Sequence, residues 1–383
     1  MGFPSLPEIR IEKREKPSRL LVAKTIAFSI AISFITMSCI LACFGISPIT
    51  AYSIMFLRAL GTGYGLSFLG LKFIPLLLCS TGLLVAFRAK VWNIGAEGQL
   101  LMGAVAATWL ALYAMPEAPG FLLVPCMFIV GFLAGSAWAF LPALLRAKLN
   151  VNEVITTLMM NYIAMELFNY LVQGPWRRSA YLFPETEELP EQAQLPVIPG
   201  TSVHYPTLAI AIGAVLFVAV MMWRTKIGYE VKLVGDNPEA ARQAGVSAQK
   251  IVLFTMLFSG GLAGLAGVGE VAGNPAHHKL YYSPEIISAG HGYTAIIVAW
   301  LSRLNPLGLL LSAFFISLML AGGSILKTAS FRIAPTPETA RALANAAHEL
   351  VGIFNGVMLI CLVAGELLTK YKITLRWGGR GEL

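Results

Sequence analysis

Polar side chains interrupt the apolar stretches of this chain at a few positions, and these positions carry whatever chemistry it performs. Asn93, Glu97 and Gln99 stand together at the start of one such stretch, and further amide, hydroxyl and carboxyl groups stand in later ones. A polar group among apolar residues is costly unless it faces a cavity or another polar group. We therefore take as candidates for lining a solute path Asn93, Glu97, Gln99, Asn152, Thr156, Asn161, Glu166 and Tyr293.

The candidates also have structural interpretations. Glu97 and Gln99 can cap an interrupted helix and satisfy its free backbone groups, which is the role we favour for them. Asn152 and Thr156 are four residues apart and share a helix face. Asn161 lies about 140° further round at ~100° per residue. All three can line a path or bond neighbouring helices.

Two further candidates have alternatives of their own. Glu166 falls inside an apolar stretch, where a carboxylate is a functional candidate, unless it is protonated or pairs with a cation. Tyr293 and Trp92 can stack on a planar solute, but Trp and Tyr also anchor helices at membrane interfaces. For Trp92, beside Lys90, we favour the anchor.

Catalytic and metal-binding patterns are missing from the sequence. Neither a Ser/His pair nor two carboxylates form a catalytic constellation in the apolar stretches, and no glycine-rich nucleotide-binding loop occurs. His277 and His278 lack a third ligand at a useful spacing, so we expect this pair to be solvated. The sequence thus predicts no catalytic residue, no metal site and no cofactor bound by this chain.

The elements that must hold these residues are membrane helices. Hydrophobic residues make up 57% of the 383 residues and charged residues 13%, where a soluble domain has roughly a quarter charged. We predict an all-α, polytopic transmembrane helical bundle of about ten spans. The spans are expected at 22–45, 73–88, 95–115, 121–145, 154–173, 207–224, 252–272, 288–302, 307–326 and 349–369.

Basic residues orient these spans. With alternating spans and a cytoplasmic residue 1, 20 of the 28 Lys and Arg residues fall in cytoplasmic segments. This bias places both termini in the cytoplasm. The net charge of +8 then reflects topology and anionic lipid rather than nucleic acid. The predicted domains are a cytoplasmic tail at 1–21, a transmembrane domain at 22–369 and a cytoplasmic tail at 370–383.

Two loops within the transmembrane domain are too long to be simple connectors. Residues 174–206 are external and rich in proline and glutamate. Residues 225–251 are cytoplasmic. There Asp236 or Asn237 can cap a short helix that Pro238 begins and Gly245 ends. Such a helix is a natural docking element for a soluble partner.

Two glycine-bearing breaks suggest an internal repeat. Gly95-Ala96-Glu97-Gly98-Gln99 opens the third predicted span and Ala289-Gly290-His291-Gly292-Tyr293 opens the eighth. These spans run in opposite directions, as in an inverted-topology repeat with interrupted helices near the substrate path. Two such pentads also arise by chance, so both interpretations stand.

The segment Gly235-Asp236-Asn237-Pro238-Glu239-Ala240-Ala241-Arg242-Gln243-Ala244-Gly245 resembles the coupling loop of ABC importer permeases. The best-known form of that loop continues with a proline, where this chain has Ile251-Val252-Leu253-Phe254. The departure fits the branched-chain amino acid, ribose and nucleoside permease family. Val91–Gln99, Asn150–Tyr162 and Leu301–Gly308 resemble segments of its nucleoside (basic membrane protein-associated) members, so the resemblance covers most of residues 70–370.

The resemblance implies a type II ABC importer-like permease in a bacterial cytoplasmic (inner) membrane. Coupling to the ATPase would fall to Asp236, Asn237, Pro238, Glu239, Ala240, Ala241 and Gly245. The implied partners are a cytoplasmic ABC ATPase that binds ATP and Mg, a second permease subunit forming a heterodimer, and an external substrate-binding lipoprotein. The implied solutes are nucleosides or related purines, whose hydroxyls and base edges Asn and Thr can bond.

Alternatives remain for function. An ABC permease for a simple sugar such as ribose would work in the same way. A secondary transporter or channel would work without ATP and would need ion-coupling carboxylates, for which Glu97, Glu166 and Glu270 are the candidates. An intramembrane enzyme is the most distant hypothesis.

Overall fold

The computed structural model describes residues 8–13, 18–178 and 183–376, and the chain divides into two compact units. Unit 1 comprises the two end regions, Met1–Ala51 and Lys327–Leu383, and unit 2 comprises Tyr52–Leu326. Helices α2 (Pro48–Gly61) and α13 (Gly308–Ile333) each run across a boundary between the units.

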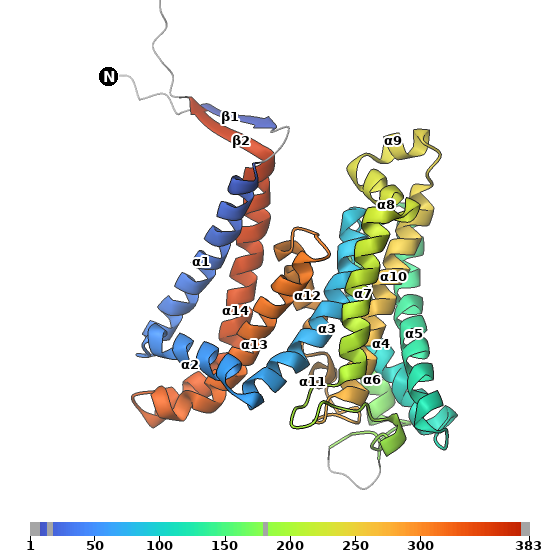
Figure 1. Cartoon of the computed structure of the whole chain (residues 1–383), viewed down its shortest axis with the longest axis vertical. Helices are drawn as coiled ribbons and strands as arrows, with labels where there is room; N and C mark the ends of the chain where they lie inside the picture. The colour runs from blue at the N-terminus through green and yellow to red at the C-terminus, as the bar shows by residue number, and fades with distance from the viewer. Residues whose placement is uncertain (1–7, 14–17, 179–182, 377–383) are drawn as a thin grey trace, which may run out of the picture. The chain divides into compact units, whose positions relative to one another are not determined.

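Unit 1 is built on a pair of long helices, α1 (Arg19–Cys43) and α14 (Pro337–Lys370), which pack along each other. The rings of Phe34 and Phe354 meet edge to face with centroids 5.0 Å apart. Strand β1 (Glu8–Lys13) precedes α1, and β2 (Tyr371–Arg376) follows α14 directly. The two strands pair antiparallel, as Figure 1 shows, so both end segments of the chain lie at the same end of this unit.

The two strands depart from the predicted all-α class. Both segments alternate apolar and polar residues in part, which is the period of a strand rather than a helix. They fall in or next to the predicted polar tails, 1–21 and 370–383. The rest of the predicted helical class is confirmed.

Unit 2 contains the remaining elements, all helical. They are α3 (Gly63–Arg88), α4 (Ala96–Trp109), the π-helical turn η1 (Leu110–Ala114), α5 (Gly120–Leu149), α6 (Glu153–Gln173), the 3-10 turn η2 (Glu191–Ala193), α7 (Tyr205–Arg224), α8 (Lys226–Asp236), α9 (Pro238–Gln243), α10 (Ala248–Val268), the π-helical turn η3 (Gly269–Gly273), α11 (Pro284–Ser288) and α12 (His291–Leu301).

Glycines bring the central helices of unit 2 into backbone contact. Gly131 and Gly135 of α5 face Gly260 and Gly264 of α10, and a Cβ on Gly264 would overlap the carbonyl oxygen of Gly131. Gly103 of α4 approaches Gly264 in the same way. Small residues four apart allow such close approach between membrane helices, where dispersion contacts replace the hydrophobic effect as the driving force. The α4, α5 and α10 backbones therefore form the centre of the unit.

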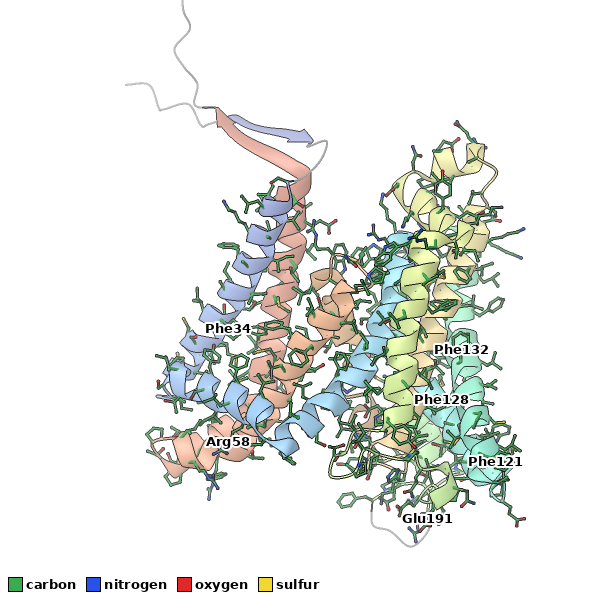
Figure 2. The ribbon with its side chains drawn as sticks, viewed as in Figure 1. Phe34, Arg58, Phe121, Phe128, Phe132 and Glu191 are labelled. Atoms are coloured by element: carbon green, nitrogen blue, oxygen red, sulfur yellow. The ribbon has the colours of Figure 1, made fainter. Side chains whose placement is uncertain are left out.

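Larger side chains fill the space beside these glycines. Phe128 and Phe132 lie along α5, as Figure 2 shows. A Cβ on Gly261 would overlap the ring of Phe132, so that ring occupies the space that the glycine leaves. Phe128 joins a buried cluster with residues of α4, α6 and α10, among them Phe168, which is fully buried.

Within the part of the chain that the structure describes, seven helices are long and apolar enough to cross a membrane. They are Leu20–Cys43, Gly63–Arg88, Gly120–Leu149, Tyr205–Arg224, Ala248–Gly273, Gly308–Ile333 and Glu349–Thr369. Each coincides with a predicted span. The prediction for 73–88 began ten residues late, because polar residues such as Ser67 and Lys72 lie within the helix that Thr62 caps.

The other three predicted spans are not among these seven. The segment 288–302 holds only the 11 residues of α12, and 95–115 holds the 14 residues of α4 followed by a π-helical turn. The segment 154–173 is α6, which has 21 residues but includes Asn161 and Glu166. The expectation of about ten spans is thus not matched by helix length and hydropathy alone.

Candidate functional site

The two predicted glycine-bearing breaks exist, and each separates one helix from the next. Residues 91–94, between α3 and α4, belong to no helix or strand. Ala289 and Gly290 adopt left-handed φ angles of 44° and 69° between α11 and α12. A helix start leaves backbone N–H groups without partners in its own helix, so each break must find acceptors elsewhere.

Glu97 supplies those acceptors for α12. The Gly290 N–H donates to its Oε1 at 3.1 Å, and the Gly292 N–H donates to its Oε2 at 2.7 Å. Glu97 is 2% exposed. A Cβ on Gly292 would overlap the backbone of Glu97, so only glycine allows the two helix starts to meet this closely. The two pentads that resembled each other in sequence are therefore joined by a carboxylate.

Asn93 and Gln99 close the break before α4. The Asn93 side chain donates to Gln99 Oε1 at 2.9 Å and to Ser259 Oγ of α10 at 3.0 Å. Its Oδ1 accepts from Gln99 Nε2 and from the Gly95 N–H, both at 3.0 Å. Asn93 and Gln99 are fully buried, so these bonds replace water for the amide oxygen and the NH2 group of both side chains.

Asn161 of α6 joins both breaks. Its Oδ1 accepts from the Gly98 N–H at 2.9 Å, and its Nδ2 donates to the Ile94 carbonyl at 2.9 Å. The same Nδ2 donates to the Tyr293 hydroxyl of α12 at 3.1 Å. A single buried carboxamide thus bonds the segment before α4, α4 itself and α12.

The structure brings together five of the eight candidates, Asn93, Glu97, Gln99, Asn161 and Tyr293. The other three lie apart from them. Asn152 is exposed and caps α6, its Oδ1 accepting from the Val154 N–H at 2.9 Å. Thr156 bonds back to the Asn152 and Glu153 carbonyls, each at 3.3 Å. Glu166 is exposed on the outer side of α6.

Two contributors to this network were missed. Thr157, rather than Thr156, is the buried threonine of α6, and its Oγ1 accepts from the Ile94 N–H at 3.2 Å. Its spacing of four residues before Asn161 could have revealed it. Ser259 had no such signal, because only the packing of α10 brings it to Asn93.

The predicted short helix between α7 and α10 is confirmed as α9. Asn237 is its cap, and its Oδ1 accepts from the Glu239 and Ala240 N–H groups at 3.1 Å. Ala241 is fully buried, whereas Glu239 and Arg242 are exposed and pair with each other. Gly245 ends the segment with a φ of +76°. The helix therefore presents a charged surface on a backbone fixed at both ends.

A second buried polar group centres on Glu270 in η3. Its Oε2 accepts from Asn274 Nδ2 at 3.3 Å and lies 3.6 Å from His277 Nδ1, while its Oε1 lies 4.0 Å from His291 Nε2. The prediction that His277 is solvated is wrong, because its side chain is only 12% exposed. Burial lowers the pKa of His277 to about 4, so its ring is neutral at pH 7.

The loop at 174–206 packs on the segment that carries His277. Lys279 Nζ donates to Glu185 Oε1 at 2.9 Å, and this bond raises the pKa of Lys279. The backbone N–H groups of Thr186 and Leu189 donate to the carbonyls of Leu280 and His278 at 3.0 and 2.7 Å. Glu187 of the same loop pairs with Arg178 at 3.2 Å, so two of its acidic residues are paired.

Seven membrane-length helices, close glycine packing and helix starts held inside the bundle by side chains define a polytopic membrane protein with interrupted helices. The chain belongs to the family described as branched-chain amino acid transport system / permease component, whose model matches residues 65–363. It is a membrane permease, a transport subunit and not an enzyme.

Similar proteins of known name agree with this family. The chain is 32% identical to the glucose ABC transporter permease protein TsgB13 of Haloferax volcanii over 98% of this chain and 96% of that protein. It is 30% identical to the nucleoside ABC transporter permease protein NupB of Lactococcus lactis over 77% of this chain and 82% of that protein. It is 33% identical to the guanosine ABC transporter permease protein NupP of Bacillus subtilis over 70% of this chain and 76% of that protein.

Proposed function

We propose that this permease is one of two membrane subunits of an ATP-driven importer that carries nucleosides or related purines into the cell. The observation that carries the proposal is α9, a capped helix with a buried Ala241 and an exposed Glu239–Arg242 pair, in the segment that resembles a coupling loop. ABC ATPases bind ATP and Mg themselves, so this chain needs only a docking surface through which such a subunit can drive its conformational change.

We further propose a type II importer topology with ten crossings and both ends in the cytoplasm. The pairing of β1 with β2 supports an even number of crossings, because it holds the two end segments at one end of unit 1. The seven apolar helices alone would give an odd number of crossings. Helices α4, α6 and α12 would supply the three others as interrupted or polar helices, which membrane proteins tolerate where the helix faces protein or a cavity.

In this arrangement 1–21, 225–251 and 370–383 are cytoplasmic, 22–369 is the permease domain, and 174–206 is external. A second permease subunit forms a heterodimer with this chain, and an external lipoprotein delivers the solute. The membrane is the bacterial cytoplasmic membrane. The contact between Glu97 and the start of α12 supports the inverted repeat, because it joins the two pentads.

A simple sugar is the second candidate solute. The relative that spans nearly all of this chain is named a glucose permease, whereas the nucleoside and guanosine permeases match about three quarters of it. A nucleoside carries a ribose, so the two candidates share a ring with neighbouring hydroxyls.

The coupling proposal is tested by reversing the charges of α9. Glu239→Arg together with Ala240→Glu is expected to abolish uptake and co-purification of the ATPase while the subunit remains in the membrane. The matched control is Glu117→Arg together with Ala118→Glu, the same dipeptide in the segment between α4 and α5, where the glutamate is exposed and the alanine half-buried, as in α9. Intact uptake by the α9 variant would refute the coupling role.

A further inference from the structure

The exposed side of α6 carries a stripe of side chains that is poorly suited to contact with lipid. The helix is about 31 Å long at 1.5 Å per residue, which is enough to cross a membrane, yet it is not among the seven apolar helices. Its exposed side chains fall within an arc of about 100° at ~100° per residue. They are Ile155, Met159, Tyr162, Ile163, Glu166, Tyr170 and Gln173.

Glu166 stands near the middle of that arc and about 10 Å before the end of α6, by the helical rise. Among the described residues, none bonds to its carboxylate through a hydrogen bond or an ion pair. A charged group at this depth is retained where it faces water, a solute or a charge on another chain. The stripe therefore faces something other than lipid.

Aromatic rings flank the carboxylate on both sides. Tyr162 lies one helical turn before Glu166 and Tyr170 one turn after it, and they are 59% and 67% exposed. Tyr162 directly follows Asn161, whose side chain donates to the Tyr293 hydroxyl at 3.1 Å. The stripe thus adjoins the network at the helix breaks.

This set of groups matches a neutral, polyhydroxylated ring. An ionised carboxylate only accepts, and its two oxygens can take two hydrogen bonds from neighbouring hydroxyls. Tyrosine rings pack against the apolar face of a sugar or a base and keep a hydroxyl for polar contact. If a helix of a second permease subunit covered this stripe instead, that helix would have to supply a cation or a hydrogen-bond donor to Glu166.

We propose that the Tyr162–Glu166–Tyr170 stripe is a wall of the solute path, and that Glu166 binds two neighbouring hydroxyls of the solute as it passes. The solute is a ribose within a nucleoside or a free sugar. This inference rests on the proposed importer function and assigns its path a binding residue. It also separates the path from the buried polar residues, which bond one another.

The test uses the complete importer in liposomes, with its binding protein saturated. Uptake of a ribonucleoside is compared with that of its 2′,3′-dideoxy analogue, and uptake of glucose with that of 2-deoxyglucose. For each pair, the uptake rate of the intact solute is divided by that of its deoxy analogue, in the wild type and in Glu166→Gln. The ratio of the variant is then divided by the ratio of the wild type, so that the binding protein's own preference cancels.

Glu166→Gln keeps the size of the side chain and one acceptor oxygen. The ratio for the transported solute is expected to fall roughly tenfold, the effect of one lost charge-assisted bond. Tyr170→Ala should slow uptake of intact and deoxy solutes alike. The matched control, Tyr205→Ala on α7, removes a 50% exposed tyrosine from another helix and should change neither.

Other results overturn the inference. An unchanged ratio, or an equal loss for both solutes, means that Glu166 does not bind the hydroxyls. Loss of the second membrane subunit from purified Glu166→Gln, but not from Tyr205→Ala, makes the stripe a subunit interface. If the wild-type importer carries neither solute, the proposed function itself fails, and this inference falls with it.

Discussion

The contact of Glu97 with the start of α12 allows a quantitative prediction. Its carboxylate accepts from the Gly290 N–H, which is part-buried, at 3.1 Å and from the buried Gly292 N–H at 2.7 Å, across 193 and 195 residues of sequence. Glu97→Ala leaves both donors without a partner. Each unsatisfied buried donor costs about 1–3 kcal/mol, so the expected loss is about 2–6 kcal/mol.

Two milder substitutions order the effects. Glu97→Gln keeps one oxygen but turns an NH2 group toward the second donor, so the loss should be about half that of alanine. Glu97→Asp keeps both oxygens on a side chain one methylene shorter, which cannot reach Gly290 and Gly292 together. The order of stability is expected to be wild type, then Gln and Asp, then Ala.

The measurement is thermal unfolding of the purified protein in detergent, followed by tryptophan fluorescence. A Tm lowered by roughly 4–12 °C is expected for Glu97→Ala, given about 2 °C per kcal/mol for large domains. Glu117→Ala, which removes an exposed carboxylate beyond α4, is the control and should leave Tm unchanged. A Glu97→Ala protein as stable as this control would show that water replaces the carboxylate and that the contact does not hold the helix starts.

Four further predictions follow from the same contacts. Ser259→Ala removes one donor partner of Asn93 and should cost about 1 kcal/mol in a thermal unfolding assay, without loss of assembly. Gly264→Leu should abolish folded protein, measured as the yield of monodisperse material, because its side chain would meet the α5 backbone. Asn237→Ala should destabilise α9 by about 1 kcal/mol and lower ATPase-coupled uptake with little change in overall Tm. The pKa of His277 is lowered from 6.5 to about 4, so the stability it contributes is full above pH 6.5 and is lost as pH falls toward 4; His277→Gln should flatten the decline of Tm over that range.

Local features of the chain could be predicted from the sequence. The breaks at Asn93-Ile94-Gly95 and at Ala289-Gly290 depend on glycine and asparagine, which favour turns and caps by their own backbone chemistry. The helix α9 followed from a cap, a proline and a terminal glycine in order. These turn and capping signals act within a few residues, and therefore the local sequence is enough to predict them.

Contacts between distant segments could not be predicted in this way. The bonds from Gly290 and Gly292 to Glu97 depend on how α4 and α12 pack, and hydropathy carries no information about that packing. Thr157, which joins the buried network, lies one residue after the predicted Thr156, and one residue equals about 100° of helix rotation. A helix with several polar sides does not reveal which of them faces its neighbours.

The polar residues of the bundle fall into two classes, buried and exposed, with different roles. Asn93, Glu97, Gln99 and Asn161 are at most 2% exposed, and they bond one another, the backbone at the helix breaks and the hydroxyls of Ser259 and Tyr293. A solute could reach them only by breaking bonds that hold the helices in place. Glu166 has the opposite character, since it is exposed on α6 with no bonding partner among the described residues. Transport requires weak, reversible contacts, and so the exposed carboxylate is better suited to touch the solute than the buried groups behind it.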